Sequence, residues 1–325
     1  MKAWEVIDGK LAYCDVPMPR AAPGEVVIQV THVGICGSDV AKLRRPEAFA
    51  LPEPWRPGHE IVGLDEVGQA VIVDALVPCG RCGSCAVGDI HCCPDLRRIG
   101  WDLPGGFAEY VAVPRANLRP VPAGLDPDLA VLADPAAVAV HGVRCSGPTP
   151  PGRLAVLGAG TIGLLTAAYA SEIGWDVTVL IRSHSRLACL TRGSPFRFVH
   201  VADAASERPF DVVVDAATGH NSQPLELALQ LIRDGGTVVV QNAYEPGVLL
   251  QTPLRSVFRR SIRLVGSFSY CRRKDPDDLA EALDLVRRLP DISDCLTSER
   301  WPAVNLPEAL DALRVKDATK AVLRT

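Results

Sequence analysis

Short apolar runs separated by turn-forming residues fill the first half of the chain. Residues 26–30, 71–73 and 110–113 are rich in the β-branched and aromatic residues that favour strands, and prolines and glycines lie between these runs. The pattern predicts an irregular β-domain over residues 1–146. Proline and glycine crowd residues 146–152 and cannot continue a regular element, so we expect the domain boundary there.

The second half alternates between strand-type and helix-type segments. We expect strands at residues 154–157, 177–181, 211–215 and 237–241, and helices at residues 163–173 and 225–232. Such alternation is typical of a parallel sheet with helical crossovers, which predicts an α/β domain of the doubly wound kind over residues 147–270.

The tail, residues 271–325, contains a predicted amphipathic helix. Asp275 is its expected cap and Pro276 its first residue. Its predicted apolar stripe consists of Leu279, Leu283, Val286 and Leu289.

Composition and charge narrow the class of protein. The 325 residues carry a formal charge of -4 and are 48% hydrophobic, which suffices for two cores and gives no reason to expect a nucleic acid partner. The first ten residues lack the apolar segment of a signal peptide, and no run of 18 apolar residues occurs. We therefore expect no membrane partner and a cytoplasmic location.

A glycine-rich turn follows the first predicted strand of the second domain. The sequence G-A-G-T-I-G at residues 158–163 lies between a strand and a helix, the context that a dinucleotide site requires. The glycines allow a tight turn, a close approach of the pyrophosphate and close helix packing, and the helix N-terminus attracts the diphosphate. The predicted cofactor-binding residues are Gly158, Gly160, Thr161, Ile162 and Gly163.

The end of the next strand bears on the choice of dinucleotide. An acid that binds the ribose 2′-hydroxyl is expected about 20 positions after the turn, but Ile181 stands there. Arg182, Ser183 and Arg186 follow, and a 2′-phosphate would accept charge-assisted hydrogen bonds of about 1.5–3 kcal/mol each from such groups. We predict NADP(H) in preference to NAD(H); alternatively, the arginines are solvated surface charges.

Five of the eleven cysteines lie between Cys79 and Cys93. An odd number of cysteines in a long chain without a secretory signal argues against a disulfide framework. The spacing of Cys79, Cys82, Cys85 and Cys93 suits a tetrahedral zinc with no open position, which is a structural site. Cys92 competes with Cys93 for the fourth position. This predicted zinc lobe covers residues 78–94.

Three further segments carry ligand-type residues: G-I-C-G-S-D at residues 34–39, P-G-H-E-I-V-G at 57–63 and L-A-D-P-A-A-V-A-V-H-G-V at 132–143. Together with the cysteine lobe, the G-G-F-A-E-Y-V run, the glycine-rich turn and A-T-K-A-V-L near the end, they resemble the zinc-containing medium-chain alcohol dehydrogenases. The resemblance covers nearly the whole chain and is strongest to the polyol, threonine and secondary-alcohol branches. It implies a GroES-like irregular β-barrel catalytic domain, a Rossmann domain, and a segment 271–325 that returns to the catalytic domain.

The resemblance also implies two zinc ions per chain. Cys36 and His59 match two ligands of a catalytic zinc, and Asp134 stands where the family has its third. Family spacing favours Cys93 as the fourth ligand of the structural zinc. A catalytic zinc keeps one open position and acidifies what binds there. The implied reaction is hydride transfer between an alcohol or carbonyl substrate and the nicotinamide.

Three residues around the catalytic zinc receive roles from the same resemblance. Glu60 matches an acid beside the zinc, Ser38 the hydroxyl that takes the alcohol proton, and Asp39 the carboxylate that orients the zinc-bound histidine. The chain departs from the family at Ala41, where many relatives have a proton-relaying histidine. It also has only 20 positions between His59 and Cys79, about one hairpin fewer than relatives.

Some assignments stay open on sequence alone. Trp55 and Trp101 flank the zinc motifs as core or as pocket residues, and Arg97 with Arg98 forms a solvated pair or binds an acidic substrate group. A zinc-free enone or quinone reductase and a non-enzymatic nucleotide-binding protein are the competing functions, although retention of the ligand set argues against both. The resemblance implies a homodimer or homotetramer, formed through an edge near residues 262–268.

Overall fold

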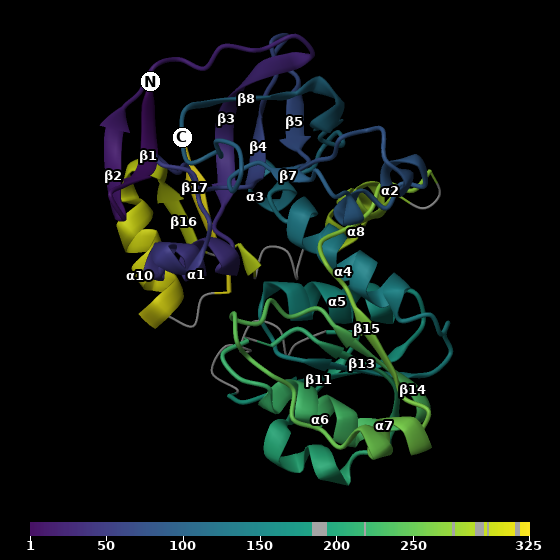
Figure 1. Ribbon diagram of the computed structural model, residues 1–325. Helices are drawn as coiled ribbons and strands as arrows, with labels where there is room; N and C mark the ends of the chain where they lie inside the picture. The colour runs from purple at the N-terminus through teal and green to yellow at the C-terminus, as the bar shows by residue number, and fades with distance from the viewer. Residues whose placement is uncertain (184–193, 218, 275–276, 290–295, 298, 316–318) are drawn as a thin grey trace. The chain divides into compact units, whose positions relative to one another are not determined.

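The computed structural model describes residues 1–183, 194–217, 219–274, 277–289, 296–297, 299–315 and 319–325. The chain divides into two compact units (Figure 1). The first contains Met1–Asp134 and Cys271–Thr325, and the second contains Pro135–Tyr270. None of the helices in the described ranges has the length and apolar character that crossing a bilayer requires.

A mixed sheet of seven strands builds the first unit, in the order β16–β17–β3–β4–β5–β9, with β8 also paired to β3. β8 pairs with residues 25–29 of β3, and β17 pairs with residues 32–34. The strands are β3 (Glu25–Gly34), β4 (Glu60–Leu64), β5 (Ala70–Val73), β8 (Tyr110–Pro114), β9 (Leu118–Pro120), β16 (Glu299–Pro302) and β17 (Ala321–Arg324). The chain's last described strand therefore lies directly beside its longest one.

Smaller elements surround this sheet. Two further pairs are β1 (Lys2–Ile7) with β2 (Lys10–Asp15), and β6 (Leu76–Val77) with β7 (Arg97–Arg98). The helices are α1 (Gly37–Arg44), α2 (Gly83–Ala86), α3 (Pro127–Ala130), α8 (Asp278–Arg288) and α10 (Leu306–Val315). Alternate residues of β3, namely Val26, Ile28 and Val30, point into the core of the unit, as the period-2 pattern of a strand dictates.

A tight hairpin fills the short interval between His59 and Cys79. β4 pairs with β5 from Ile61 opposite Val73 to Leu64 opposite Ala70. The Asp65 carboxylate accepts hydrogen bonds from the backbone N–H groups of residues 67 and 69, at 3.0 and 2.8 Å. The sheet then continues through β9, so β5 is covered on both of its edges.

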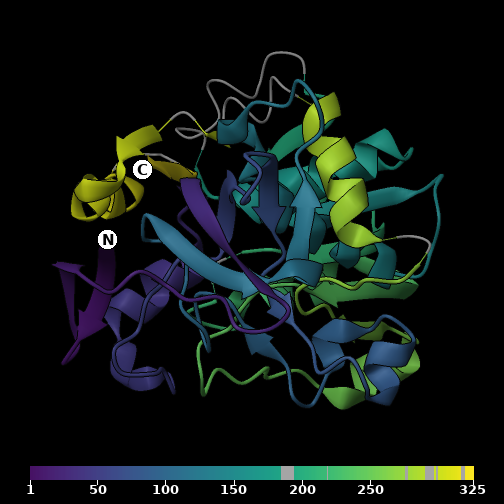
Figure 2. The same cartoon turned by 90° about the horizontal axis from the view of Figure 1, so that it is seen from above.

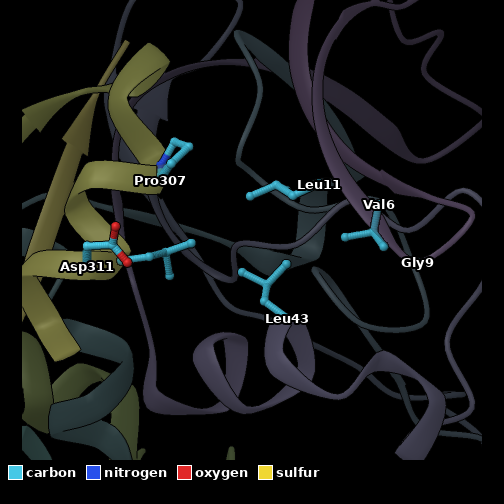
Figure 3. Close-up of a pocket in the computed structure, with 7 residues that line it drawn as sticks. Val6, Gly9, Leu11, Leu43, Pro307 and Asp311 are labelled. Carbon is cyan, nitrogen blue, oxygen red and sulfur yellow. The ribbon is translucent and has the colours of Figure 1, made fainter.

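The C-terminal segment packs against the N-terminal hairpin. Leu306 and Leu310 of α10 are buried in the same core as Trp4, whose indole N–H donates to the Ala303 carbonyl at 2.7 Å. Figures 1 and 2 show α10, in yellow, on the same side of the unit as the purple β1–β2 hairpin. An open pocket between them is lined mainly by aliphatic side chains, among them Val6, Leu11, Leu43 and Pro307, with Asp311 as its acid (Figure 3).

The tail helix begins later than its sequence predicts. α8 starts at Asp278, and its cap is Asp277, whose carboxylate accepts from the N–H groups of Leu279 and Ala280 at 2.9 and 3.0 Å. Asp277, and not Asp275, therefore satisfies the first N–H groups. Asp275 and Pro276 themselves lie outside the described residues. The predicted stripe is buried at Leu279, Leu283 and Val286 and half-buried at Leu289.

A six-stranded parallel sheet forms the second unit, in the order β12–β11–β10–β13–β14–β15. This is the doubly wound order of dinucleotide-binding domains, so the predicted fold class is confirmed. The strands are β10 (Arg153–Leu157), β11 (Asp176–Ile181), β12 (Arg197–His200), β13 (Phe210–Asp215), β14 (Ile232–Val240) and β15 (Arg263–Gly266). The helices are α5 (Thr161–Glu172), α6 (Gln223–Leu231), α7 (Leu254–Arg259) and α4 (Ala133–Cys145), which begins in the first unit.

Candidate functional site

Cys36 lies at the junction between strand β3 and helix α1. It is the cap residue of α1, and its backbone N–H donates to the Asp39 carboxylate at 3.1 Å. Asp39 sits in the first turn of α1 and is fully buried. Ser38 lies between them in sequence and is half-buried. The capping geometry therefore fixes the Cys36 thiol and the Asp39 carboxylate on one short element.

His59 follows Gly58, a position that only glycine can occupy without strain. Gly58 has a φ of +95°, and a Cβ there would lie 2.6 Å from the ring of Phe107. Backbone N–H groups of Gly106 and Phe107 donate to the carbonyls of Gly58 and Pro57, at 2.8 and 3.1 Å. The G-G-F-A run thus clamps the loop that presents His59.

Asp39 faces the imidazole of His59. The distance from Oδ1 of Asp39 to Nδ1 of His59 is 3.5 Å. Burial lowers the pKa of His59, but the negative charges of Asp39 and Cys36 outweigh it and raise that pKa well above its ordinary value. Burial raises the pKa of Asp39, yet the charges of His59 and Lys42 lower it overall. The negative charges around the His59 imidazole therefore favour a positive charge on the ring.

A buried ion pair stands beside these residues. Both carboxylate oxygens of Glu60 accept from the Lys320 ammonium at 2.6 Å, and Glu60 and Lys320 are 1% and 2% exposed. Burial lowers the pKa of Lys320, but the charge of Glu60 outweighs it and raises that pKa. Gly34 makes room for the pair, because a Cβ there would lie 2.0 Å from a Glu60 oxygen. Lys320 directly precedes strand β17, which pairs with β3.

The structure brings together ligand atoms that are dispersed in sequence. The Cys36 sulfur, a His59 nitrogen and a Glu60 oxygen all lie within 4.8 Å of one another. This donor set of thiolate, imidazole and carboxylate suits a zinc ion. Asp134, the predicted third ligand, is not part of that group; it stands in the first turn of α4, where its charge acts on Lys320. Sequence reasoning missed Lys320, although the A-T-K-A-V-L run that contains it was a family signal.

The cysteine lobe forms a second, separate group of ligand atoms. The sulfurs of Cys79, Cys82, Cys85 and Cys93 lie within 4.8 Å of one another, with Sγ–Sγ distances of 4.0 Å between Cys79 and Cys85 and 3.4 Å between Cys82 and Cys85. Four thiolates about 2.3 Å from one zinc would lie about 3.8 Å apart, so this spacing fits. Cys93 is buried within the group, whereas Cys92 is exposed.

The four thiols of the lobe do not have equal pKa values. Hydrogen bonds from the backbone of Arg81 and Cys82 help lower the pKa of Cys79 to about 7. Burial and the neighbouring Cys82 raise the pKa of Cys85 to about 11. Four mutually close sulfurs cannot all ionise without a cation between them, because each thiolate opposes the next. The lobe thus has the chemistry of a closed metal site.

The glycine-rich turn has the geometry that a diphosphate requires. Gly158 has a φ of +100°, which permits the tight turn at the end of β10. A Cβ on Gly163 would lie 2.1 Å from the Gly158 carbonyl, whereas a Cβ on Gly160 would meet nothing within 4 Å. The backbone at Gly160 is therefore open to an incoming group, and Thr161 and Ile162 begin helix α5 behind it.

The end of β11 lies beside this turn. The Gly158 N–H donates to the Leu180 carbonyl at 3.0 Å. Ile181 is buried at the end of the strand, and Arg182 and Ser183 follow it as exposed residues. Arg186 lies outside the described residues. The end of the strand therefore has an exposed arginine at position 182 and no acid at position 181.

The structure also shows the surroundings of the aromatic and basic residues whose roles the sequence did not decide. Trp55 is 1% exposed and donates to the Gly100 carbonyl at 3.0 Å, which makes it a core residue. The Arg98 guanidinium lies 3.8 Å from the centre of the Trp101 ring and pairs with Asp102 at 2.9 Å. Arg98 is therefore engaged by its own loop and not by solvent alone.

Comparison with known proteins agrees with this geometry. Residues 22–123 match the family model described as the alcohol dehydrogenase GroES-like domain. The chain is 31% identical to L-galactonate-5-dehydrogenase of Escherichia coli K12, covering 95% of this chain and 94% of that protein. It is 30% identical to D-altritol 5-dehydrogenase of Agrobacterium fabrum C58, covering 97% and 96%.

A solved structure resembles the chain over its full length. It is described as a zinc-binding dehydrogenase from Sinorhizobium meliloti 1021 bound to NADP, with 28% identity, a TM-score of 0.87, and coverage of 100% of this chain and 99% of that one. Ligand-type residues, the doubly wound sheet and full-length similarity to curated dehydrogenases thus agree. The chain belongs to the zinc-containing medium-chain alcohol dehydrogenase family.

Proposed function

We propose that this protein oxidises a secondary hydroxyl of a polyol or sugar acid, or reduces the corresponding carbonyl, with a nicotinamide dinucleotide as hydride acceptor or donor. The observation that carries the proposal is the meeting of Cys36, His59 and Glu60 next to the buried carboxylate of Asp39. The names of the two curated relatives support the substrate class, since both act at the fifth carbon of a polyhydroxylated chain.

Cys36, His59 and Asp134 would hold the catalytic zinc. When bound, the metal would act as a Lewis acid that lowers the pKa of a substrate hydroxyl. Asp39 would orient His59 by accepting from Nδ1, which leaves Nε2 for the metal. Ser38 would accept the hydroxyl proton, and its half-buried position on α1 next to Cys36 supports that role.

Glu60 is the alternative third ligand, because its carboxylate lies in the same group of ligand atoms as Cys36 and His59. Both Glu60 oxygens are engaged by Lys320, so metal binding by Glu60 would require this ion pair to open. Asp134 stands in the first turn of α4, and its charge also acts on Lys320. In the cobalt-substituted protein, Asp134→Asn should lose the part of the visible spectrum that depends on Cys36, whereas Glu60→Gln should keep it; the reverse result would assign the third ligand to Glu60.

The cysteine lobe would hold the second, structural zinc through Cys79, Cys82, Cys85 and Cys93. Their sulfur spacing and the exclusion of Cys92 from the group support this assignment. Such a closed site leaves no position for substrate. Elemental analysis should find two zinc ions per chain, and one or none would contradict the proposal.

The dinucleotide would be NADP(H) in preference to NAD(H), bound at Gly158, Gly160, Thr161, Ile162 and Gly163. The exposed Arg182 and Ser183 at the end of β11 and the absence of an acid at Ile181 support this choice. Arg186 belongs to the same proposal by sequence alone.

A substrate screen that follows reduced-nicotinamide absorbance tests the function. Polyols, aldonic acids and simple secondary alcohols should be compared with enones and quinones, each before and after zinc chelation. Oxidation of polyols that chelation abolishes is the expected result. Chelator-insensitive reduction of enones would instead establish the competing zinc-free reductase.

We also propose that the protein forms a homodimer or homotetramer through the β15 edge of its parallel sheet. β15 ends the strand order, and Leu264 and Phe268 near it are 46% and 53% exposed. Such an edge can pair with its copy. Light scattering should report two or four chains, and a monomer would contradict the proposal.

A further inference from the structure

A second buried lysine lies close to the candidate metal site, and the proposed mechanism does not use it. Lys42 is on α1, one turn after Asp39, and its side chain is 0% exposed. Its ammonium lies 3.7 Å from the centre of the Trp101 ring and 5.4 Å from that of Trp55. Among the described residues it has no hydrogen-bond acceptor. Such a group is costly to bury, so its retention needs a reason.

The surroundings of Lys42 favour its charged form only in part. The nearest acidic group is Asp39, whose Oδ1 lies 3.9 Å from the ammonium. The two indole rings contribute cation–π attraction, which is stronger where water is excluded. Arg98 opposes the charge and Asp102 supports it. Burial outweighs the charges of Asp39 and Cys36 and lowers the pKa of Lys42 below its ordinary value.

The same Asp39 oxygen faces the metal-site histidine on one side and the lysine on the other. Its distances are 3.5 Å to His59 Nδ1 and 3.9 Å to Lys42 Nζ, and no hydrogen-bond partner among the described residues claims it. Lys42 is therefore the positive group that balances Asp39 when His59 is neutral. Neutral imidazole is the form that binds a metal.

We propose that Lys42 is a positioning residue of the catalytic metal site, whose ammonium balances the charge of Asp39 and thereby sets the electrostatic potential at His59 and Cys36. The inference rests on the proposed function of that site. Two buried acids beside the proposed ligands then each have a lysine nearby. Glu60 pairs with Lys320, and Asp39 lies close to Lys42.

The competing interpretation is that Lys42 only fills space between two tryptophans. The two interpretations differ in the shifts that they predict. A space-filling role predicts that Lys42→Met leaves the electrostatic potential of the site unchanged. A charge-balancing role predicts opposite electrostatic shifts that cancel when both charges are removed.

A charge cycle separates the interpretations, with Lys42→Met, Asp39→Asn, the double variant, and Lys10→Met as an exposed control that removes one positive charge elsewhere. The first readout is the acid limb of the rate–pH profile for alcohol oxidation. Removing a positive charge near the site favours protonated forms, so the limb in Lys42→Met should move up by about one pH unit. Asp39→Asn should move it down, and the double variant should return it close to the wild-type position.

The second readout does not depend on turnover. In the cobalt-exchanged protein, the thiolate-to-cobalt band of the catalytic site is obtained by subtracting the spectrum of Cys36→Ala, which retains only the lobe contribution. This band should shift in opposite directions in the two single variants and return in the double variant. Lys42→Arg, which keeps the charge, should match wild type in both readouts even if its kcat is lower.

The outcomes are distinguishable from failure of the proposed function. A wild-type protein without a Cys36-dependent cobalt band would overturn the metal site itself. A wild type with that band whose position is unmoved by Lys42→Met overturns the role of Lys42. If Lys42→Met does not fold, the neutral double variant should fold, because its buried acid is gone as well; a double variant that also fails to fold, or single variants whose shifts are not opposite in sign, supports space filling instead.

Discussion

The two candidate metal sites of the first unit are built in opposite ways. The cysteine lobe collects its four sulfurs within 14 positions of sequence, and backbone N–H groups of Cys79 and Cys85 donate to sulfurs of the same group. The candidate catalytic site collects Cys36 from the start of α1, His59 and Glu60 from the start of β4, and Lys320 from before β17, 260 positions after Glu60. The lobe is therefore local, whereas the catalytic site depends on the register of the whole sheet.

This difference also appears in charge and burial. The lobe sulfurs are half-buried apart from Cys93, and among the described residues no histidine or carboxylate joins their group. The catalytic site contains two fully buried carboxylates, Asp39 and Glu60, each with a buried lysine nearby. A site that must change its protonation needs such balanced charges, whereas a closed structural site needs only its ligands.

The largest expected effect is the loss of activity when a ligand of the proposed catalytic zinc is removed. Cys36→Ala removes a ligand of the proposed catalytic zinc, and loss of a Lewis acid worth several kcal/mol should lower kcat/KM by about a thousandfold or more. Zinc content should fall from two to one per chain. Cys14→Ala, on β2, is the matched control and should keep both values. Retained turnover in Cys36→Ala would remove Cys36 from the mechanism.

The next effect tests whether the catalytic site depends on its ion pair. Lys320→Met leaves the Glu60 carboxylate buried without its cation, which should cost about 3–5 kcal/mol of unfolding free energy. Combining it with Glu60→Gln should restore much of that loss, because no charge is then left unpaired. Denaturant unfolding measures both, with exposed Lys10→Met as the control. Equal destabilisation by the single and double variants would contradict the ion-pair argument.

A smaller effect is expected in the lobe. Cys82→Ser should lose the structural zinc and lower stability by about 2–4 kcal/mol, the range of a covalent cross-link over a short loop. Activity per folded molecule should stay close to wild type. Cys92→Ser changes the exposed neighbour and should leave zinc content and unfolding unchanged. A zinc loss in Cys92→Ser would place that cysteine among the ligands.

The smallest effect concerns the cofactor. Arg182→Ala should lower the ratio of catalytic efficiencies, NADP over NAD, by about tenfold, the value of one charge-assisted hydrogen bond. It should change little with NAD itself. Arg255→Ala, an exposed arginine on α7, is the matched control. An unchanged ratio in Arg182→Ala would show that this arginine is a solvated surface charge.

How far each site could be predicted from sequence follows from how it is built. The lobe and the turn at Gly158 are readable because their spacing is local, and the family resemblance and both fold classes are confirmed. The pairing of Glu60 with Lys320 was not readable, since it requires the β3–β17 register and the space left by Gly34. The burial of Lys42 was equally hard to predict, because a lysine on a helix usually lies on its solvated face. Cytoplasmic location stays a prediction.

The 260-position interval between Glu60 and Lys320 has a consequence for the order of events during synthesis. The lobe can close once residue 93 has left the ribosome, but Glu60 stays without its counter-charge until Lys320 has emerged. At about 5–20 residues per second, these moments lie roughly 10–45 s apart. The nascent chain therefore passes through a period in which all four cysteines of the lobe are available while Glu60 still lacks its lysine partner.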